Sequence, residues 1–255
     1  MILSIVIPVY NEVHTLGSII AVAGNVLPDV PKEIIVVDDC SDDGTCEWLK
    51  ANFPDGPRSG TNILVRGDGS LEFGSGTSAA VTVQPIYHQT NKGKGGGLRT
   101  GFGAVTGDVV VIQDADLEYD PHDWSAMYEL IAVRKVADVV YGSRFYGRPH
   151  RSLYFHHYLA NRLISVLFNL IYNQTLTDIE TCYKMMTRDV LRSLHLSADD
   201  FGIEIEISAR IARQHTLRIY ELGITYYGRT YADGKKVNWT DGAKALWYLF
   251  KFRFR

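Results

Sequence analysis

The chain has 255 residues, of which 46% are hydrophobic and 22% are charged, and its formal net charge at neutral pH is −3. This length allows a large core in one α/β domain or in two smaller ones. The small net charge gives no support to nucleic-acid binding by bulk electrostatics, and no apolar run reaches the ~18 to 20 residues of a membrane span.

Short apolar runs alternate with helix-like segments, which predicts an α/β fold with a mostly parallel sheet flanked by helices. The first strand is expected over 3–10, a helix over 12–27, and a second strand from Lys32 that ends in an acidic cluster. A helix over 43–53, with Asp43 or Thr45 as its cap, precedes a Gly/Ser-rich flap or hairpin insertion over 55–80. Further strands are expected over 81–88, 108–114 and 137–145, and further helices over 91–105 and 120–135.

The segment "VVVIQDADLEYDP" places Asp114, Asp116 and Glu118 directly after a buried strand. Carboxylates crowded at a strand end repel one another, and a divalent cation removes that repulsion. Hard oxygen ligands favour Mg²⁺ or Mn²⁺. Because residues two apart in an extended segment point to opposite sides, we expect only one of Asp114 and Asp116 to bind the metal directly.

The other predicted strands also end in polar or glycine-rich segments: "PVYNE", "VVDDCSDDG", "NKGKGGG" and "YGSRF". Open α/β sheets bind ligands at the carboxyl ends of their strands, so these segments predict a site at one edge. The acidic cluster offers acceptors to a ribose or to a base; its members are Asp38, Asp39, Asp42 and Asp43. The glycine-rich segment suits a phosphate cradle, although Lys92, Lys94 and Arg99 are equally well explained as solvated charges.

These motifs, with "TDIETCYKMM", resemble the family-2 glycosyltransferases of the GT-A fold over residues 2–54 and 84–240, and are most similar to the dolichyl- or polyprenyl-phosphate hexosyltransferases. The resemblance implies inverting, metal-dependent transfer of a hexose from a GDP- or UDP-sugar to polyprenyl or dolichyl phosphate. It also implies a GT-A domain over 1–235, with a nucleotide-binding half over 1–120 and an acceptor half over 121–235. Position 118 is often Gln in the mannosyl-phosphate enzymes, and Glu118 adds a negative charge.

The resemblance also assigns roles to individual residues. Asp39 is expected to read the base, and Arg144, with Arg148 or Arg151, to hold the acceptor phosphate. Asp178 either orients the acceptor, acts as base toward a hydroxyl acceptor, or caps a following helix. The implied catalytic residues are Asp116, Arg144 and Asp178; the implied metal ligands are Asp114, Asp116 and Glu118; the implied contacts to the nucleotide sugar are Pro8, Tyr10, Asn11, Glu12, Asp38, Asp39, Lys94, Asp114, Ala115, Asp116, Arg229, Lys235 and Lys236.

Two segments suit a membrane surface. An interfacial helix is expected within 151–173, where Asn161, Ser165, Asn169 and Asn173 form a narrow polar stripe on an otherwise apolar helix; a buried core helix explains the same pattern. The tail over 236–255 contains "AKALWYLFKFRFR", which fits an amphipathic helix or, with its alternating end, an edge strand. We therefore expect peripheral attachment to the cytoplasmic face of a membrane, with a separate membrane protein as partner.

The three cysteines, Cys40, Cys46 and Cys182, lack metal-ligand spacing and predict reduced thiols in a cytoplasmic protein. Three alternatives to sugar transfer onto a lipid phosphate stay open. One is a glycosyltransferase acting on a glycan or protein hydroxyl, and another is a non-catalytic nucleotide-binding GT-A protein. A sugar nucleotidyltransferase is the third, and it is disfavoured because "PVYNE" replaces the glycine-rich, Arg-containing first loop that such an enzyme needs.

Overall fold

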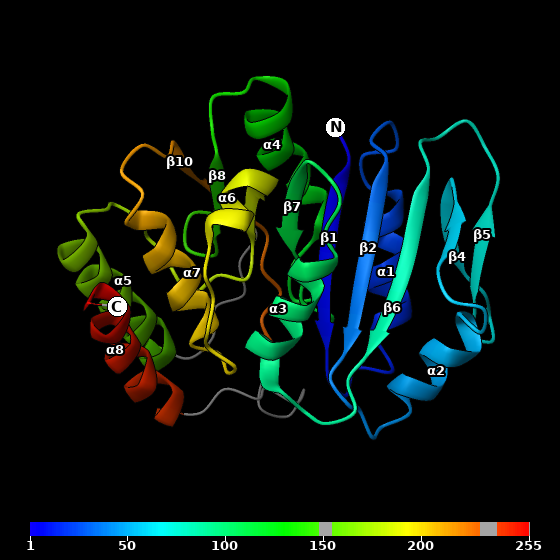
Figure 1. Ribbon diagram of the computed structural model, residues 1–255, viewed down its shortest axis with the longest axis horizontal. Helices are drawn as coiled ribbons and strands as arrows, with labels where there is room; N and C mark the ends of the chain where they lie inside the picture. Colours follow the sequence, from blue (N-terminus) through cyan, green and yellow to red (C-terminus); the bar gives the residue numbers. More distant parts are fainter. Residues whose placement is uncertain (148–154, 230–238, 255) are drawn as a thin grey trace.

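The computed structural model describes residues 1–147, 155–229 and 239–254. Its main feature is a single sheet of eight strands (Figure 1). In spatial order these are β10 (Ile219–Gly223), β8 (Val139–Ser143), β9 (Lys184–Thr187), β7 (Val109–Ile112), β1 (Leu3–Val9), β2 (Lys32–Asp38), β6 (Val81–Tyr87) and β3 (Arg58–Gly60).

Six of these strands run in the same direction. β1 is parallel to both β2 and β7, β6 is parallel to β2, and β10 is parallel to β8. Only β9, which is antiparallel to β7 and β8, and the short edge strand β3 run the other way. The predicted α/β class with a mostly parallel sheet is therefore confirmed, and the parallel strands bring their carboxyl ends to one edge of the sheet.

Helices cover both faces of the sheet because the central strands are buried on both sides, as their unbroken apolar runs require. In Figure 1, α3 (Gly93–Ala104) crosses in front of the sheet and packs on β1 and β2, while α1 (Leu16–Asn25) lies behind β2. α2 (Thr45–Asn52) begins after Gly44, and Asp43 Oδ1 accepts hydrogen bonds from the Thr45 backbone and hydroxyl.

The helix predicted over 120–135 is not uniform. It starts as a 3₁₀ turn, η1 (Pro121–Asp123), continues as α4 (Trp124–Tyr128) and ends as a π-helical turn, η2 (Glu129–Val133). Asp120 caps its start by accepting a hydrogen bond from the His122 backbone N–H. Pro121, which lacks an N–H, fits this first turn, where no intrahelical partner exists.

The segment 55–80 lies at the β6 edge of the sheet. β3 pairs with β6, while β4 (Asn62–Val65) and β5 (Leu71–Gly74) form a separate antiparallel hairpin that packs on α1. Asn25 holds β4 through two hydrogen bonds to Ile63, and Trp48 Nε1 donates to the Gly69 carbonyl. The hairpin therefore rests on the α1 side of the molecule, where β4 and β5 appear beyond β6 in Figure 1.

The half after residue 150 contains elements that the sequence did not predict: β9, α6 (Arg188–Ser193), α7 (Ile203–Ala212) and β10. β9 is inserted antiparallel between β7 and β8, so the last three residues of the "TDIETCYKMM" motif begin a central strand. The helix that Asp178 was expected to cap is absent, because the next element along the chain is β9. The capping interpretation was wrong.

α5 (Phe155–Tyr172) and α8 (Trp239–Phe254) pack together, and α7 packs on α8, at the left end of Figure 1. The alternating end of α8 is helical, so the edge-strand alternative was wrong. Within the described part of the chain, no helix combines the length and the hydropathy needed to cross a bilayer.

Candidate active site

A cavity of about 930 Å³ opens at the carboxyl ends of the strands. Pro8 from β1, Asp39 after β2, Lys94 on α3, Asp116 after β7 and Arg144 after β8 all line it. The far wall comes from α5, the start of α7, and α8. The polar strand ends that the sequence predicted to meet do meet here.

Asp114, Asp116 and Glu118 all line this one cavity. The expectation that Asp114 and Asp116 point to opposite sides was wrong, because β7 ends at Ile112 and the chain turns at residues 115 and 116. Leu117 then takes a left-handed conformation with φ of 61°. The turn removes the two-residue alternation of a strand and gathers the carboxylates on one side.

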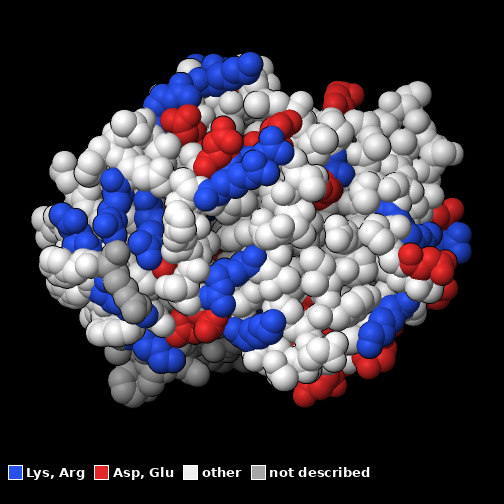
Figure 2. All heavy atoms as spheres, in the orientation of Figure 1, with Lys and Arg blue, Asp and Glu red and all other residues white. Residues whose placement is uncertain are grey.

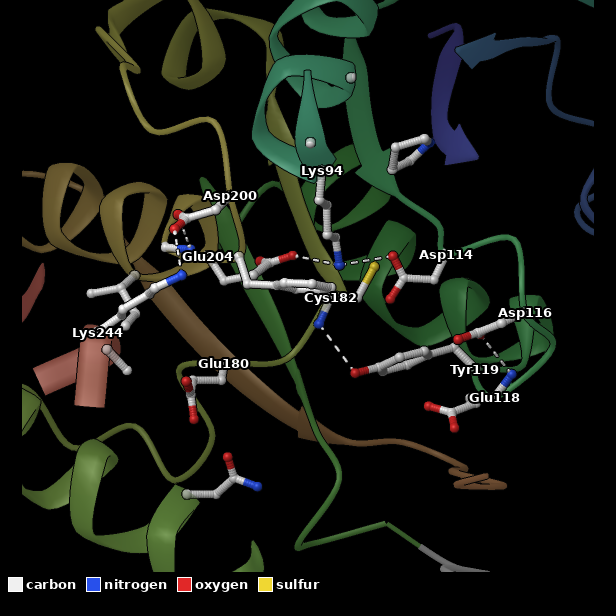
Figure 3. A pocket seen from close by; sticks show the side chains of 18 of the residues that line it. Lys94, Asp114, Asp116, Glu118, Tyr119, Glu180, Cys182, Asp200, Glu204 and Lys244 are labelled. Carbon is white, nitrogen blue, oxygen red and sulfur yellow. Dashed lines mark hydrogen bonds and ion pairs between the residues drawn. The ribbon is translucent and has the colours of Figure 1, made fainter. Parts of the chain in front are cut away.

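Asp114 is held by a buried cation. Lys94 Nζ lies 2.8 Å from Asp114 Oδ1 and 3.0 Å from Glu204 Oε1, and Figure 3 shows the ammonium group pointing between the two carboxylates. Lys184 Nζ contacts the other Glu204 oxygen at 2.5 Å. Burial lowers the pKa of Lys94, but the charges of Asp114 and Glu204 outweigh it and leave that pKa well above its ordinary value. Lys94 therefore neutralises Asp114 inside the protein.

The surroundings of Asp116 suit the binding of a cation. Its Oδ1 accepts the Glu118 backbone N–H, and its Oδ2 accepts no hydrogen bond from the described residues. Burial, reinforced by the charges of Asp114 and Glu118, raises the pKa of Asp116 to about 7. Within the described ranges no three Asp, Glu, His or Cys side chains form a ready metal cage. The residues thus fit a cation that takes one ligand from Asp116 and the rest from its substrate and water.

Glu118 accepts hydrogen bonds from the segment that follows β10. Its Oε2 accepts the Tyr226 hydroxyl at 2.8 Å, and its Oε1 accepts the Arg229 backbone N–H at 2.5 Å. The Arg229 guanidinium also donates to Glu12 at 3.0 and 3.1 Å and to the Asp116 carbonyl at 2.6 Å. Arg229 thereby brings a positive charge beside the D-x-D turn, which contains Asp114 and Asp116. Lys235 and Lys236, which were also predicted to contact the nucleotide sugar, lie outside the described residues.

The predicted nucleotide contacts separate into two groups. Pro8, Tyr10, Glu12, Asp39 and Ala115 join the residues above in lining the cavity. Two others are not among the described residues that line it. The Asn11 side chain exchanges hydrogen bonds with Asp42, and the Asp38 carboxylate is fully buried with no hydrogen-bond partner in the described ranges. Their roles stay predictions.

Two N–H groups of the glycine-rich segment are already used within the protein. The N–H groups of Gly95 and Gly96 donate to the Asp199 carbonyl. A Cβ on Gly95 would lie 2.2 Å from the Ala198 carbonyl oxygen, so glycine is needed for this close approach. Arg99 donates to that carbonyl and pairs with the Asp199 carboxylate. The segment therefore joins α3 to the loop before α7.

Arg144 and Asp178 form a buried pair. Arg144 Nε and Nη2 each donate to a different Asp178 oxygen at 2.7 Å, and the Arg144 backbone N–H donates at 3.1 Å. Asp178 is fully buried and is not among the described residues that line the cavity. Its geometry makes it a positioning group for Arg144, which does line the cavity. The predicted neighbours Arg148 and Arg151 lie outside the described residues.

Several residues of the site were missed from the sequence. Glu180 lines the cavity, and burial, opposed by the Arg144 charge, raises its pKa to about 7. Glu204 and Tyr226 also line it, and His88 holds Asp39 at 2.7 Å. The acidic pair in "DIETC" was a visible signal for Glu180. The other three depend on contacts between distant segments and had no local signal.

Comparison with known proteins identifies a family model. The model for glycosyl transferase family 2 matches residues 4–81 and 78–194, which together cover most of the chain. Its span includes β1, β2, the D-x-D turn and Arg144, and it ends before α7.

Curated relatives match over most of the chain. An undecaprenyl-phosphate mannosyltransferase of Micrococcus luteus is 27% identical over 240 residues, which cover 90% of this chain and 85% of that protein. A dolichol-phosphate mannosyltransferase of Pyrococcus furiosus is 25% identical, with 93% of this chain and 61% of that protein covered. An undecaprenyl-phosphate 4-deoxy-4-formamido-L-arabinose transferase of Yersinia enterocolitica is 26% identical, with 91% and 62% covered. The chain thus spans about three fifths of the last two relatives.

Solved structures support the fold. Glucosyl-3-phosphoglycerate synthase of Mycobacterium tuberculosis, solved with Mn²⁺, UDP and phosphoglyceric acid, superimposes with a TM-score of 0.67 at 18% identity, covering 98% of this chain and 78% of that one. The same enzyme has been solved with Mg²⁺ and UDP, with a TM-score of 0.64. The expected GT-A architecture is thereby confirmed.

Proposed function

The chain belongs to glycosyltransferase family 2, and we propose that it transfers a hexose from a nucleotide diphosphate sugar to a polyprenyl phosphate, with inversion at the anomeric carbon. The relatives whose names specify undecaprenyl or dolichol phosphate support this acceptor. The observation that carries the proposal is one cavity that joins the D-x-D turn to Arg144 beside an apolar wall.

The donor diphosphate belongs at the D-x-D turn. Asp116 would hold Mg²⁺ or Mn²⁺ through its free oxygen, and the cation would offset charge on the leaving diphosphate. Arg229 lies on the same side and adds a second positive charge. Structures of glucosyl-3-phosphoglycerate synthase, an enzyme of the same fold, contain Mn²⁺ or Mg²⁺ with UDP, which supports this choice of cofactor. Lys94 keeps Asp114 neutralised and fixed beside this site.

The acceptor phosphate belongs at Arg144. Of the five N–H donors on an arginine side chain, two bind Asp178, which leaves three for an anion. A phosphate monoester has a second pKa near ~6 and is largely a dianion at neutral pH, so it needs no strong base. One of its oxygens forms the bond to the anomeric carbon, and the nucleoside diphosphate leaves with the electrons of the broken C–O bond. The enzyme's task is then alignment and charge stabilisation.

Apolar side chains continue the cavity beyond Arg144. Ala160, Leu163 and Ile164 on α5 and Leu246 on α8 line this part of the wall. A sugar, glycan or protein hydroxyl would gain little from such a surface, whereas an isoprenoid chain buries apolar area there at about 25 cal/mol per Å². The wall therefore favours a lipid-linked acceptor.

Two helices present apolar side chains outward, which supports peripheral membrane attachment. On α5, Leu159, Leu163 and Leu170 are exposed, and on α8, Trp247 and Phe250 are exposed. Figure 2 shows Lys and Arg gathered over the left part of the molecule, where Figure 1 places α7 and α8. An aromatic and basic surface of this kind binds anionic lipid headgroups. Attachment at the cytoplasmic face, and a separate membrane protein as partner, stay predictions.

One observation favours a hydroxyl acceptor as second candidate. Such a nucleophile needs a general base, and Glu180 lines the cavity with its pKa raised by burial to about 7. Asp178, which the sequence suggested for this role, is already paired through both oxygens with Arg144. If the acceptor is a hydroxyl, the base is therefore Glu180.

Sugar transfer to a short polyprenyl phosphate in detergent tests the proposal. UDP- and GDP-hexoses would be supplied with Mg²⁺ or Mn²⁺ and with EDTA as the metal-free control. We expect metal-dependent lipid product from the wild type, a loss of roughly a thousandfold in Asp116→Asn, and near-normal turnover in Glu180→Gln. Donor hydrolysis or transfer to a hydroxyl compound without lipid product, with Glu180→Gln inactive, would favour the second candidate.

A further inference from the structure

A carboxylate on the edge strand of the sheet holds the segment that carries Asp178. Glu221 is the third residue of β10, the edge strand beside β8 (Figure 1). Its Oε1 accepts the backbone N–H groups of Thr177 at 2.8 Å and of Asp178 at 3.2 Å, and its Oε2 accepts the Thr177 N–H at 3.1 Å. The segment lies between α5 and β9 outside any helix or strand, so its N–H groups need such partners.

The same segment holds Arg144 on its other side. Asp178 accepts two guanidinium N–H groups of Arg144 at 2.7 Å and its backbone N–H at 3.1 Å. Thr177 Oγ1 lies 2.7 Å from the hydroxyl oxygen of Ser143, the residue directly before Arg144. Glu221 is therefore linked to Arg144 through the backbone at 177–178 and the Asp178 side chain, although Glu221 itself is not among the described residues that line the cavity.

The charge of Glu221 does not explain its position. Burial raises the pKa of Glu221, its hydrogen bonds to Thr177 and Asp178 oppose that rise, and the Asp178 charge adds to it, so that the pKa stays above its ordinary value. Two carboxylates that repel each other are thus brought close together. The hydrogen bonds to the backbone are what makes this arrangement favourable.

We propose that Glu221 is a positioning residue for the acceptor phosphate, because it fixes Asp178 and, through Asp178, directs the three remaining N–H donors of Arg144 into the cavity. This inference rests on the proposed binding of the acceptor phosphate at Arg144 and adds a residue from outside the cavity to it. Without Glu221, the N–H groups at 177 and 178 lose their acceptor, and the Asp178–Arg144 pair moves with the segment. Displacing a binding group by about 1 Å costs up to roughly a hundredfold in rate.

Three substitutions of Glu221 separate hydrogen-bond geometry from charge. In Glu221→Gln, the charge is lost, but the amide oxygen takes the place of Oε1, which reaches both N–H groups, and only the longer contact of Thr177 at Oε2 is lost. Glu221→Asp keeps the charge but is one methylene shorter, which withdraws the acceptor. Glu221→Leu removes the acceptor altogether. We therefore expect Glu221→Gln to resemble the wild type and the other two to be impaired.

Steady-state kinetics of the full chain, with Mn²⁺, a short polyprenyl phosphate and the nucleotide sugar that the wild type uses, test this. For Glu221→Leu and Glu221→Asp we expect kcat/KM for the acceptor to fall by roughly tenfold or more, with the donor KM within about twofold of the wild type. The donor is expected to change little because Asp116 and Arg229 form no hydrogen bond with 177–178 among the described residues.

Glu33→Leu is the matched control. Glu33, near the start of β2, accepts the backbone N–H groups of Thr106 at 2.6 Å and of Gly107 at 2.9 Å, so it also fixes a loop, but at the edge of the sheet opposite the cavity. This substitution should lower the urea midpoint and leave the acceptor KM unchanged. A second check uses Arg144→Lys, which lacks the two-point pair with Asp178. In that background Glu221→Leu should change kcat/KM for the acceptor by less than about threefold.

The outcomes separate this inference from the proposed function. Wild-type acceptor kinetics in a folded Glu221→Leu, an equal rise in donor and acceptor KM, or an undiminished effect in the Arg144→Lys background overturns the inference and leaves sugar transfer to a lipid phosphate standing. An impaired Glu221→Gln beside a normal Glu221→Asp also overturns it, and this comparison decides if Glu221→Leu does not fold. If the wild type forms no lipid product, both fail.

Discussion

Substitution of Glu204 by Gln should destabilise the protein strongly, because Glu204 neutralises a buried cation. The buried charge cluster consists of Lys94, Asp114, Glu204 and Lys184, with two positive and two negative groups. Lys184 is fully buried, and its Nζ contacts Glu204 Oε2 at 2.5 Å and the Thr181 carbonyl, with the Tyr141 ring centroid 5.6 Å away. Lys94 Nζ lies 3.0 Å from Glu204 Oε1, but the two atoms are not aligned for a hydrogen bond. When Glu204 is replaced, Lys94 therefore still has Asp114 as its ion-pair partner.

The magnitude follows from the charge left behind. Glu204→Gln removes one of the two negative charges and leaves Lys184 as an uncompensated buried cation, a change that costs about 3–5 kcal/mol. Adding Lys184→Met restores neutrality in the cluster and replaces the stem of the lysine with an apolar chain of similar length. The double variant should therefore be more stable than the sum of the single effects, with a coupling free energy of about 2 kcal/mol.

Urea unfolding followed by circular dichroism measures these free energies for the wild type, both single variants and the double variant. Glu72→Gln is the matched control, because Glu72 pairs with Arg66 at 3.2 Å and both side chains are about half exposed, at 47% and 58%. That substitution should cost less than ~1 kcal/mol. A cost for Glu204→Gln no larger than that of Glu72→Gln, or strictly additive effects in the double variant, would refute the argument.

Three further predictions concern the acceptor side. Arg144→Lys, which loses the two-point pair with Asp178, should raise the KM for polyprenyl phosphate by roughly tenfold or more with donor KM little changed; a selective rise in donor KM would place Arg144 elsewhere. Burial raises the pKa of Glu180 to about 7, so its contribution to stability is complete below about pH 4.5 and is lost as the pH rises through 7. In Glu180→Gln the fall in the free energy of unfolding over that interval, measured by urea unfolding at each pH, should be smaller by about 1–3 kcal/mol, and an unchanged fall counts against the raised pKa. Leu170→Ser combined with Trp247→Ser should reduce sedimentation with anionic vesicles several-fold while transfer to a soluble short-chain acceptor persists; unaltered sedimentation would argue against these helices as the contact.

Local patterns in the sequence were sufficient to predict the fold class and to predict which edge of the sheet carries the site. β1, β2 and β7 are apolar runs that end in polar segments, and parallel strands must place those ends together. Asp114 and Asp116 could be named for the same reason, since they lie just after the end of β7, whereas Arg144 was named from the resemblance to the family.

Other features depended on which segments the tertiary structure brings together. The glycine-rich segment has the composition of a phosphate cradle, yet the N–H groups of Gly95 and Gly96 donate to the Asp199 carbonyl, about a hundred residues away in sequence. β9 was not predicted, because whether "YKMM" pairs between β7 and β8 depends on strand order and not on its own composition.

By itself, the sequence determined the α/β architecture, the acidic turn after β7 and the family, because these follow from periodicity, strand ends and motif order. Only the tertiary structure decided how each charged group is used. Asp39 is held by His88, Arg144 by Asp178, and Arg229 by Glu12. The members of these pairs are separated by 49, 34 and 217 residues. A carboxylate's chemistry depends on which of its oxygens are already bonded, and partners that distant meet only when the sheet has assembled.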